Sequence, residues 1–262
     1  MDAPPVLLLH GFPEFWWGWR RQIGAFAAAG MRVVVPDLRG YHRSDKPRGV
    51  RSYRMELLAR DVRDLIEDLG VARARIAAHD WGGAVAWWVA QEFPDQVERL
   101  AILNVPHPAV LRRTLLTSPE QRRRSRYMLY FQLPFLPERK LAAHGFRAFR
   151  SIFRRSSRTG TFSPADLDRY AAAAAEPGAL RAMLHWYRAA LRHPPHGRRR
   201  QPIEPPVRLI WGIGDVALGP EMIEPSAALC ERCEVFRIPD AGHWVTHEAA
   251  DEVNHLLLDF LT

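Results

Sequence analysis

Short apolar segments alternate with helix-patterned segments along most of this chain, and this alternation restricts the possible folds more than any other feature. Six short, mainly apolar runs occur, at residues 6–9, 32–36, 75–78, 100–104, 207–211 and 235–238. Helical patterns separate most of them, at residues 16–29, 53–69, 83–93, 219–231 and 246–261. Strands that alternate with helices indicate a parallel sheet, and continuous apolar strands indicate a sheet covered on both faces. The sequence therefore predicts an α/β protein with a doubly wound, mostly parallel sheet of six principal strands.

One long interval departs from this alternation. From about residue 106 to residue 202 no run is typical of a strand, and the apolar residues between 180 and 191 recur at helical spacing. Helices inserted between two strands of a parallel sheet can cover its carboxyl edge, where α/β proteins bind their ligands. We therefore predict a core formed by residues 1–105 and 203–262, with residues 106–202 inserted as an all-helical cap.

The length and composition agree with one such core. A chain of 262 residues that is 47% hydrophobic can bury one large core and a smaller appended unit. It contains no run of about twenty apolar residues, so no membrane span is expected. The first residues lack the basic and apolar regions of a signal peptide, which predicts a cytoplasmic protein.

The formal net charge of +8 raises the question of a nucleic-acid partner. Nearly all of the positive charge is arginine, since Lys46 and Lys140 are the only lysines, and alanine and proline are abundant. This bias is typical of a GC-rich coding sequence. The basic clusters also lack the interleaved aromatic residues that stack on bases. We predict no nucleic-acid partner, a small-molecule ligand, and a monomer or homodimer.

The two cysteines, Cys230 and Cys233, have C-x-x-C spacing. A zinc site would need two further ligands at suitable spacing, and a thioredoxin-like dithiol would begin a helix, whereas this pair ends a helical pattern. We predict free thiols, buried or partly exposed. His243 and His247 are spaced as H-x-x-x-H without a third ligand, so neither a metal nor a cofactor is expected.

Residues 76–83, Ile-Ala-Ala-His-Asp-Trp-Gly-Gly, place an acid where a strand turns sharply into a helix. Ala78 and Gly82 flank Asp80 at two-residue spacing, which is the pattern of the nucleophile elbow, usually written G-x-S-x-G. A carboxylate in place of the hydroxyl attacks saturated carbon and forms an alkyl ester, which water must then cleave. The alternative role of Asp80 is that of a helix N-cap, because an Asp before a helix accepts backbone N–H bonds.

Two further polar residues follow later strands. Asp215 comes just after the run 207–211, and His243 just after the run 235–238. Together with Asp80 they have the chain order nucleophile, acid, histidine that this topology uses, and all three should meet at the carboxyl edge of the sheet. Taken singly, Asp215 could form a turn and His243 could begin a helix. The combination predicts a catalytic set.

The motifs of this chain resemble those of the α/β-hydrolase fold, epoxide hydrolase family, whose aspartate-nucleophile branch includes the haloalkane dehalogenases. The matching motifs span nearly the whole chain and lie at residues 10–14, 36–45, 79–83, 104–108, 215 and 242–243. The resemblance implies that Arg39, Asn104 and His107 brace loops, and that a cis peptide precedes Pro13.

The same resemblance implies a role for each residue of the predicted site. Asp80 would attack the substrate, and the backbone N–H groups of Phe12 and Trp81 would form the oxyanion hole for ester hydrolysis. His243, oriented by Asp215, would activate water. No cofactor is implied.

The leaving group distinguishes the subfamilies. An opened epoxide leaves an alkoxide that needs a hydrogen-bond acid, and the epoxide hydrolases that this chain resembles use two cap tyrosines. Tyr127 and Tyr187 stand at the matching positions, and phenols stay protonated at neutral pH. Tyr130 is an alternative to Tyr127, and Tyr187 could merely pack in the cap. The substrate is expected to be a small lipophilic epoxide or related electrophile, bound by the aromatic residues Phe12, Trp81, Phe131 and Trp186.

Two other functions remain open from the sequence. A haloalkane or haloacid dehalogenase would use the same nucleophile, with Trp81 offering an indole N–H to halide, but Phe12 stands where haloalkane dehalogenases often have asparagine, and Trp81 where fluoroacetate dehalogenases have arginine. A non-catalytic ligand-binding or truncated member is the other alternative, because the predicted strands do not include the family's usual N-terminal antiparallel strand pair. The sequence as a whole favours cofactor-independent hydrolysis of epoxides to vicinal diols.

Overall fold

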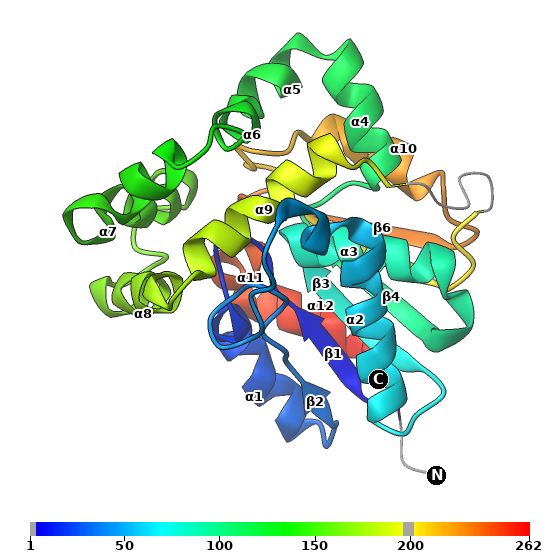
Figure 1. The fold of residues 1–262 in the computed structure, drawn as a ribbon. Helices are drawn as coiled ribbons and strands as arrows, with labels where there is room; N and C mark the ends of the chain where they lie inside the picture. Colours follow the sequence, from blue (N-terminus) through cyan, green and yellow to red (C-terminus); the bar gives the residue numbers. More distant parts are fainter. Residues whose placement is uncertain (1–3, 196–201) are drawn as a thin grey trace.

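A computed structural model describes residues 4–195 and 202–262, and these form a sheet enclosed by helices (Figure 1). Six strands lie in the order β2-β1-β3-β4-β5-β6, and every pairing is parallel. Their bounds are Val33–Val34 (β2), Val6–Leu9 (β1), Ala74–His79 (β3), Val97–Leu103 (β4), Val207–Gly212 (β5) and Cys233–Ile238 (β6). The predicted α/β fold with six principal strands is confirmed. Within the described residues no antiparallel strand pair joins this sheet.

Alternate residues of β1 enter two separate hydrophobic clusters, because successive side chains of a strand point to opposite faces. Leu7 and Leu9 pack with α2 (Met55–Asp68) and α3 (Asp80–Glu92). Val6 and Leu8 pack with α1 (Arg20–Ala28) and α12 (Ala250–Leu261) on the other face. Both faces are therefore buried, which explains why the strands are apolar without alternation.

Three predicted elements differ in extent. The strand expected at 32–36 shortens to the two-residue edge strand β2. The helix expected at 219–231 breaks into a 3-10 turn, Pro220–Met222, and the short α10, Ile223–Ala227. The chain leaves the helix there because Cys230 forms a backbone bridge with Ile203. The C-terminal helix divides into α11, Val245–Glu248, and α12.

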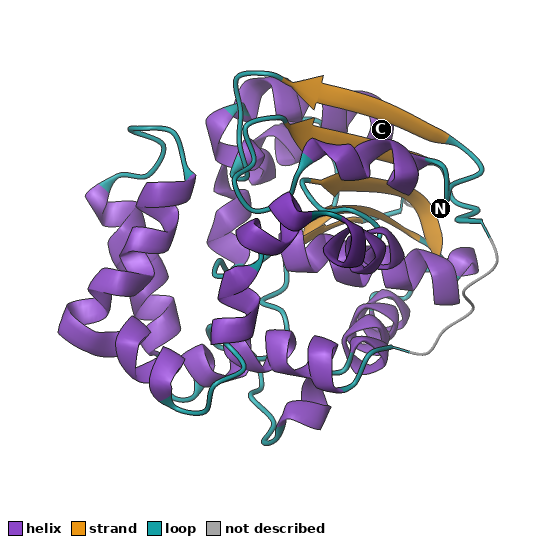
Figure 2. Ribbon diagram, turned by 90° about the horizontal axis from the view of Figure 1, so that it is seen from above, coloured by secondary structure: helices purple, strands orange, loops and turns teal. Residues whose placement is uncertain are grey.

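Within the described residues, six helices lie between β4 and β5, and Figures 1 and 2 show most of them beside the sheet rather than against its faces. They are α4 (Pro108–Thr117), α5 (Pro119–Arg124), α6 (Arg126–Tyr130), α7 (Leu136–Ser156), α8 (Pro164–Ala175) and α9 (Ala179–Arg192). α7 is interrupted at residues 143–146 by non-helical backbone. The end of the interval expected to form a cap falls partly on residues 196–201, and residues 1–3 of the expected core also lie outside the described residues. Among the described helices, none has the length and apolar character needed to cross a membrane.

Candidate active site

Asp80 lies at a sharp turn between β3 and α3. Its backbone is in the left-handed region, with φ of +49°, which is strained for a residue other than glycine and costs about 1–3 kcal/mol. Close packing holds it there: a Cβ on Gly82 would lie 2.4 Å from the carbonyl oxygen of Leu9, and one on Gly11 would lie 2.4 Å from Cβ of Asp80. α3 is preceded by His79 and has no side-chain cap, so Asp80 does not act as the N-cap.

Three predicted residues meet at the carboxyl edge of the sheet. His243 Nδ1 is 2.8 Å from Asp215 Oδ2, which is a hydrogen bond. His243 Nε2 is 3.6 Å from Asp80 Oδ2. This distance is too long for a hydrogen bond but short enough for an ion pair when His243 is protonated. Each of the three residues is at most 9% exposed, so their charges interact with little solvent screening.

This arrangement shifts two pKa values in opposite directions. Burial alone would raise the pKa of Asp215, but the charge and hydrogen bond of His243 and the N–H group of Leu218 lower it. Burial alone would lower the pKa of His243, but Asp215, Asp80 and, more weakly, Glu14 raise it to about 9. In the free protein at neutral pH, Asp215 is therefore ionised and His243 is positively charged.

Asp215 is fixed by neighbours on several sides. The backbone N–H groups of Ala217 and Leu218 donate to its Oδ1 at 2.8 and 3.0 Å. Asn104 donates to Oδ2 at 2.8 Å and accepts from the N–H of Gly212 at 2.8 Å. Asn104 is fully buried with φ of +47°, and it links the loops after β4 and β5. These contacts fix the position of the Asp215 carboxylate, which agrees with the bracing role that the resemblance implies for Asn104.

The backbone N–H of Phe12 donates to Asp80 Oδ1 at 2.7 Å. The peptide between Phe12 and Pro13 is cis, as the sequence resemblance implies. Trp81 is the second residue of α3, so its N–H belongs to the first helical turn, where backbone amides have no partner inside the helix. One oxygen of Asp80 is thus held by a backbone donor, and the other faces His243.

Aromatic rings from α6 and α9 lie over this carboxylate. The ring of Tyr187 is 5.1 Å from that of Phe12, 5.0 Å from Trp81 and 5.8 Å from Tyr127, between ring centres. Phe131 also contacts Tyr187, at 5.1 Å. Burial first, and then the charge of Asp80, raises the pKa of Tyr127; burial and the neighbouring Tyr127 raise that of Tyr187. Both phenols remain protonated and able to donate.

Tyr130 and Trp186, two of the aromatic residues considered for the site, are turned to other partners. Burial, and then the charge of Glu138, raises the pKa of Tyr130, and its ring lies beneath the ammonium group of Lys140, whereas the ring of Tyr127 contacts Tyr187. Tyr127 is therefore the better placed of the two candidates. Trp186 is 1% exposed and its indole N–H donates to the carbonyl of Arg39, so it supports Trp81 from behind, at 5.7 Å between rings.

A buried polar cluster surrounds Glu14, and no motif of the sequence predicts it. Tyr170 donates to Glu14 Oε1 at 2.7 Å and His247 Nε2 donates to the same oxygen at 2.8 Å. His79 lies 3.5 Å from Glu14 Oε2 and donates to the carbonyl of His243 at 2.7 Å. Burial alone would raise the pKa of Glu14, but the two histidines hold it well below its usual value. The signal in the sequence is an acid flanked by aromatic residues, at 12–17.

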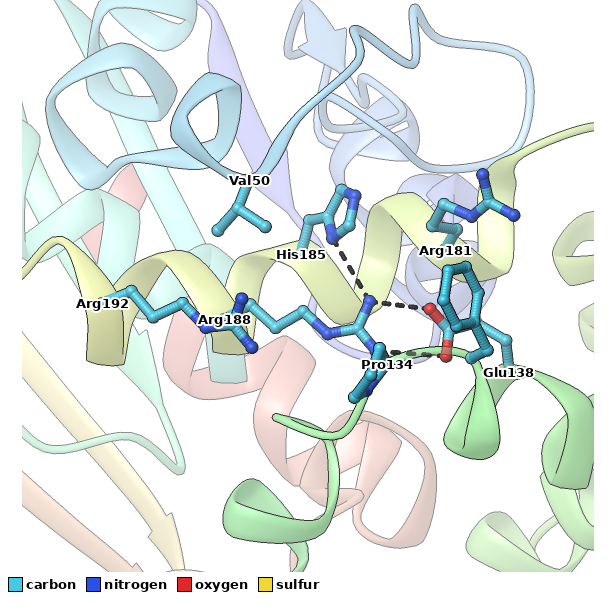
Figure 3. Close-up of a pocket in the computed structure, with 8 residues that line it drawn as sticks. Val50, Pro134, Glu138, Arg181, His185, Arg188 and Arg192 are labelled. Atoms are coloured by element: carbon cyan, nitrogen blue, oxygen red, sulfur yellow. Dashed lines mark hydrogen bonds and ion pairs between the residues drawn. The ribbon is translucent and has the colours of Figure 1, made fainter.

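A separate cavity of about 190 Å³ lies on the outer side of α9 (Figure 3). Four residues of α9 at spacings of four, three and four line it, namely Arg181, His185, Arg188 and Arg192. Arg188 is almost fully buried and binds Glu138 through two nitrogens, at 2.7 and 3.1 Å. This face of the helix points away from Tyr187, so the cavity is distinct from the site around Asp80.

Comparison with known proteins identifies relatives over the whole chain. Residues 4–250 match a family model described as alpha/beta hydrolase fold. The AB hydrolase superfamily protein YfhM of Bacillus subtilis is 40% identical over 99% of this chain and 91% of its own length. Epoxide hydrolase 4 of Mus musculus is 35% identical over 98% of this chain and 73% of its own. A crystal structure of Bacillus megaterium epoxide hydrolase with an inhibitor superposes with a TM-score of 0.90 at 31% identity, covering 99% of this chain and 94% of that one.

Proposed function

Because this chain belongs to the α/β-hydrolase fold family, we propose that it hydrolyses epoxides to vicinal diols, without a cofactor, through a covalent alkyl ester on Asp80. The placement of the Asp80 carboxylate carries the proposal. One oxygen accepts the N–H of Phe12, the other lies 3.6 Å from His243, and two protonated phenols face it from the helices above. The names of relatives such as Epoxide hydrolase 4 support the same reaction.

In the first step Asp80 Oδ2 attacks a ring carbon of the epoxide, because Oδ1 is occupied by the Phe12 N–H. A carbon–oxygen bond to Asp80 forms as the ring carbon–oxygen bond breaks. Tyr127 or Tyr187 transfers a proton to the departing oxygen, which would otherwise leave as a strongly basic alkoxide. The product of this step is a hydroxyalkyl ester on Asp80.

In the second step His243 takes a proton from a water molecule that attacks the ester carbonyl. The negative charge that develops on Oδ1 is stabilised by the N–H groups of Phe12 and Trp81. The bond between Cγ and Oδ2 of Asp80 then breaks, so Oδ2 leaves in the diol with the proton from His243, and the oxygen of the attacking water remains on Asp80. The new carboxyl group loses its proton, and the phenolate takes up a proton, which restores the starting state.

The shifted pKa of His243 gives these steps an order. Its raised pKa depends partly on the negative charge of Asp80. Alkylation removes that charge, so the pKa of His243 falls and the imidazole can lose its proton and act as a base. Formation of the ester thus converts His243 into the base that the second step needs, and His243 can be protonated before the ester forms.

The helices from α4 to α9 supply the acids of this scheme, and we interpret residues 106–202 as the cap. The rings of Phe12, Phe131, Tyr187 and Trp81 contact one another beside Asp80, and these apolar surfaces favour a lipophilic epoxide as the substrate. Halide departure requires no proton, and two phenols over the nucleophile therefore favour an epoxide over a haloalkane.

The test is incubation with styrene oxide and 1-bromobutane in parallel, with measurement of diol and of free bromide. Diol without bromide is the expected result. Bromide without diol would assign the protein to the dehalogenases instead. Neither product, from protein whose circular dichroism and melting curve show it folded, would contradict catalysis at Asp80.

A further inference from the structure

The turn between α6 and α7 carries exposed apolar side chains on the outer side of the helical insert (Figure 1). Leu133 is 44% exposed, Phe135 66% and Leu136 52%, and a proline is the only other residue among them. We call residues 133–136 the apolar loop. Leu129 of α6, just before this loop, is exposed as well. Apolar side chains that gather on one surface mark a place of contact with another apolar phase.

Hydrogen bonds attach the apolar loop to α9. The carbonyl groups of Gln132 and Leu133 accept from Arg192 and Arg188, each at 2.7 Å. Phe135 also lines the cavity of Figure 3, together with Arg192. The loop and the end of α9 therefore form one surface, with the backbone of the loop tied to the helix and its apolar side chains facing solvent.

The backbone of Phe135 lies in the left-handed region, with φ of +58°. This conformation is strained for every residue except glycine, and it persists where the surrounding structure or a function requires it. Because the Phe135 ring is also largely exposed, its burial adds little to the stability of the fold. Folding alone therefore does not favour phenylalanine at this position, whereas contact with an apolar phase does.

Positive charge is concentrated in the insert that carries the apolar loop. Residues 106–202 contain 20 of the 37 Lys and Arg of the chain but only five of its 29 Asp and Glu. The rest of the chain therefore has more acidic than basic residues. A bias toward arginine in the whole sequence does not account for this unequal distribution.

Several of these cations lie beside the apolar loop. Arg139 and Lys140, in the first turns of α7, are exposed, and so is Arg192 of α9. Glu138, the acid next to them, forms its ion pair with Arg188 instead. Among the described residues no carboxylate forms an ion pair with any of the three exposed cations. The apolar loop is thus bordered by positive charge that is available to an anionic partner.

We propose that this surface binds to bilayers that contain anionic lipids, with the apolar loop inserted at the boundary between headgroups and acyl chains. Insertion removes apolar area from water, and the neighbouring cations are attracted to the lipid charge. Phe131, whose ring contacts Tyr187 of the candidate active site, lies two residues before the loop. A lipophilic ligand dissolved in the bilayer would therefore meet the protein next to the segment that bears Phe131.

Two other occupants fit the surface less well. Nucleic acid would neutralise the cations, but leucine side chains offer no ring on which bases can stack. A second copy of this chain would place two positively charged inserts face to face, and their repulsion opposes a symmetric dimer through this surface. An anionic bilayer satisfies both the charge and the apolar side chains.

Cosedimentation with vesicles tests the proposal independently of epoxide hydrolysis. The protein should bind to vesicles of phosphatidylglycerol mixed with phosphatidylcholine, and at least about 10-fold less to phosphatidylcholine alone. Raising the ionic strength from about 0.1 M to about 1 M should weaken binding, because the Debye length falls from about 10 Å to about 3 Å. Failure to sediment with the anionic vesicles would overturn the proposal.

Phe135→Gly separates membrane binding from stability. Glycine adopts the left-handed conformation without strain, so the melting temperature should stay the same or rise, while vesicle binding should fall at least about 10-fold. Leu136→Ser should weaken binding to a similar extent, and Leu229→Ser, at an exposed position between α10 and β6, is the matched control. Binding that persists in both loop variants would assign the attraction to charge alone and overturn the proposal.

Arg139→Gln combined with Lys140→Gln should lower binding to anionic vesicles at least about 10-fold and reduce its dependence on salt. The same change at Arg154 and Arg155, exposed in the last turn of α7, removes equal charge at the other end of that helix and is the control. Equal effects of the two double variants would mean that net charge, and not this surface, governs binding. A dimer in size-exclusion chromatography that Leu136→Ser dissociates would make the surface an interface between copies and likewise overturn the proposal.

Discussion

Asp80, Asp215 and His243 are held by hydrogen bonds, whereas the aromatic residues above them are held by ring contacts. On the sheet side, the Phe12–Asp80, Asp215–His243 and Asn104–Asp215 bonds are 2.7 to 2.8 Å long. On the helix side, Tyr127, Phe131 and Tyr187 contact one another at 5.1 to 5.8 Å between ring centres. The lower part of the site, Asp80, Asp215 and His243, therefore stabilises charge by fixed hydrogen-bond donors. The upper part, Tyr127, Phe131 and Tyr187, keeps its phenols neutral by apolar burial.

This difference assigns separate tasks to the two parts. In the mechanism that we propose, the charged residues Asp80, Asp215 and His243 form and cleave the ester, and the phenols above them donate the proton. Changes in the lower part should therefore abolish or arrest the reaction, while changes in the upper part should slow only its first step. The following variants test that division in order of expected effect.

Asp80→Ala should reduce diol formation by about 10⁵-fold, because no other carboxylate of the site can form the ester. Steady-state assays with styrene oxide measure this, and Asp64→Ala, at an exposed position of α2, is the control. Residual activity within about 10-fold of wild type would remove the basis for the covalent route.

His243→Gln should lower turnover by about 10⁴-fold but leave alkylation largely intact. The ester should then accumulate, and the peptide that contains Asp80 should gain the mass of intact substrate. A peptide without an adduct, from protein that still binds substrate, would place His243 in the first step rather than the second. The exposed His255 of α12 provides the control substitution, His255→Gln.

Tyr127→Phe and Tyr187→Phe should each slow single-turnover alkylation by about 10- to 100-fold, because one phenol remains to donate. Ester hydrolysis, measured after the burst, should change little. Tyr53→Phe is a matched control, since Tyr53 is buried and its hydroxyl donates to a backbone carbonyl outside the site. An equal decrease in both steps would contradict the separation of tasks.

The pH dependence of stability should reflect the His243–Asp215 pair. The pKa of His243 is about 9 in the folded protein and about 6.5 unfolded, so its charged form stabilises the fold below pH 6.5 and this contribution disappears as the pH rises through 9. Full loss corresponds to roughly 3 kcal/mol. Urea unfolding across this range should show a steeper decline for wild type than for His243→Gln; parallel curves would exclude the raised pKa.

Trp186→Phe should have the smallest effect on catalysis, with a loss of about 1–3 kcal/mol in unfolding free energy, because it removes one hydrogen bond to Arg39 and leaves a small cavity at a buried position. The Michaelis constant should change less than about 3-fold if Trp186 only supports Trp81. A larger change would show that Trp186 contacts substrate directly, as its place among the predicted binding residues implies. Trp16→Phe, at an exposed position, is the control.

The sequence predicts the sheet edge better than it predicts the contacts across it. Asp80, Asp215 and His243 each follow an apolar strand, and parallel strands bring their carboxyl ends together, so their meeting follows from the pattern alone. Glu14, Tyr170 and His247 meet only because the segments after β1, in α8 and in α11 fold against one another. Nothing in local spacing encodes that contact.

The same reasoning accounts for the elements whose extent differed. Apolar content predicts a strand at 32–36, but only Val33 and Val34 pair with β1. Helical spacing continues past residue 227, but pairing between Cys230 and Ile203 prevents the helix from extending. In both cases a distant partner overrides the local preference.

The Glu14 carboxylate has a consequence for how ligands enter and leave. It receives donors from Tyr170 of α8 and from His247 of α11, and Arg20 joins the same helix α8 through Asp166 at 2.9 Å. An outward movement of α8 would remove the Tyr170 hydrogen bond from the buried Glu14 carboxylate. This loss costs about 1–3 kcal/mol, and exposure of apolar side chains to water would add to it. These buried contacts accordingly oppose an outward movement of α8.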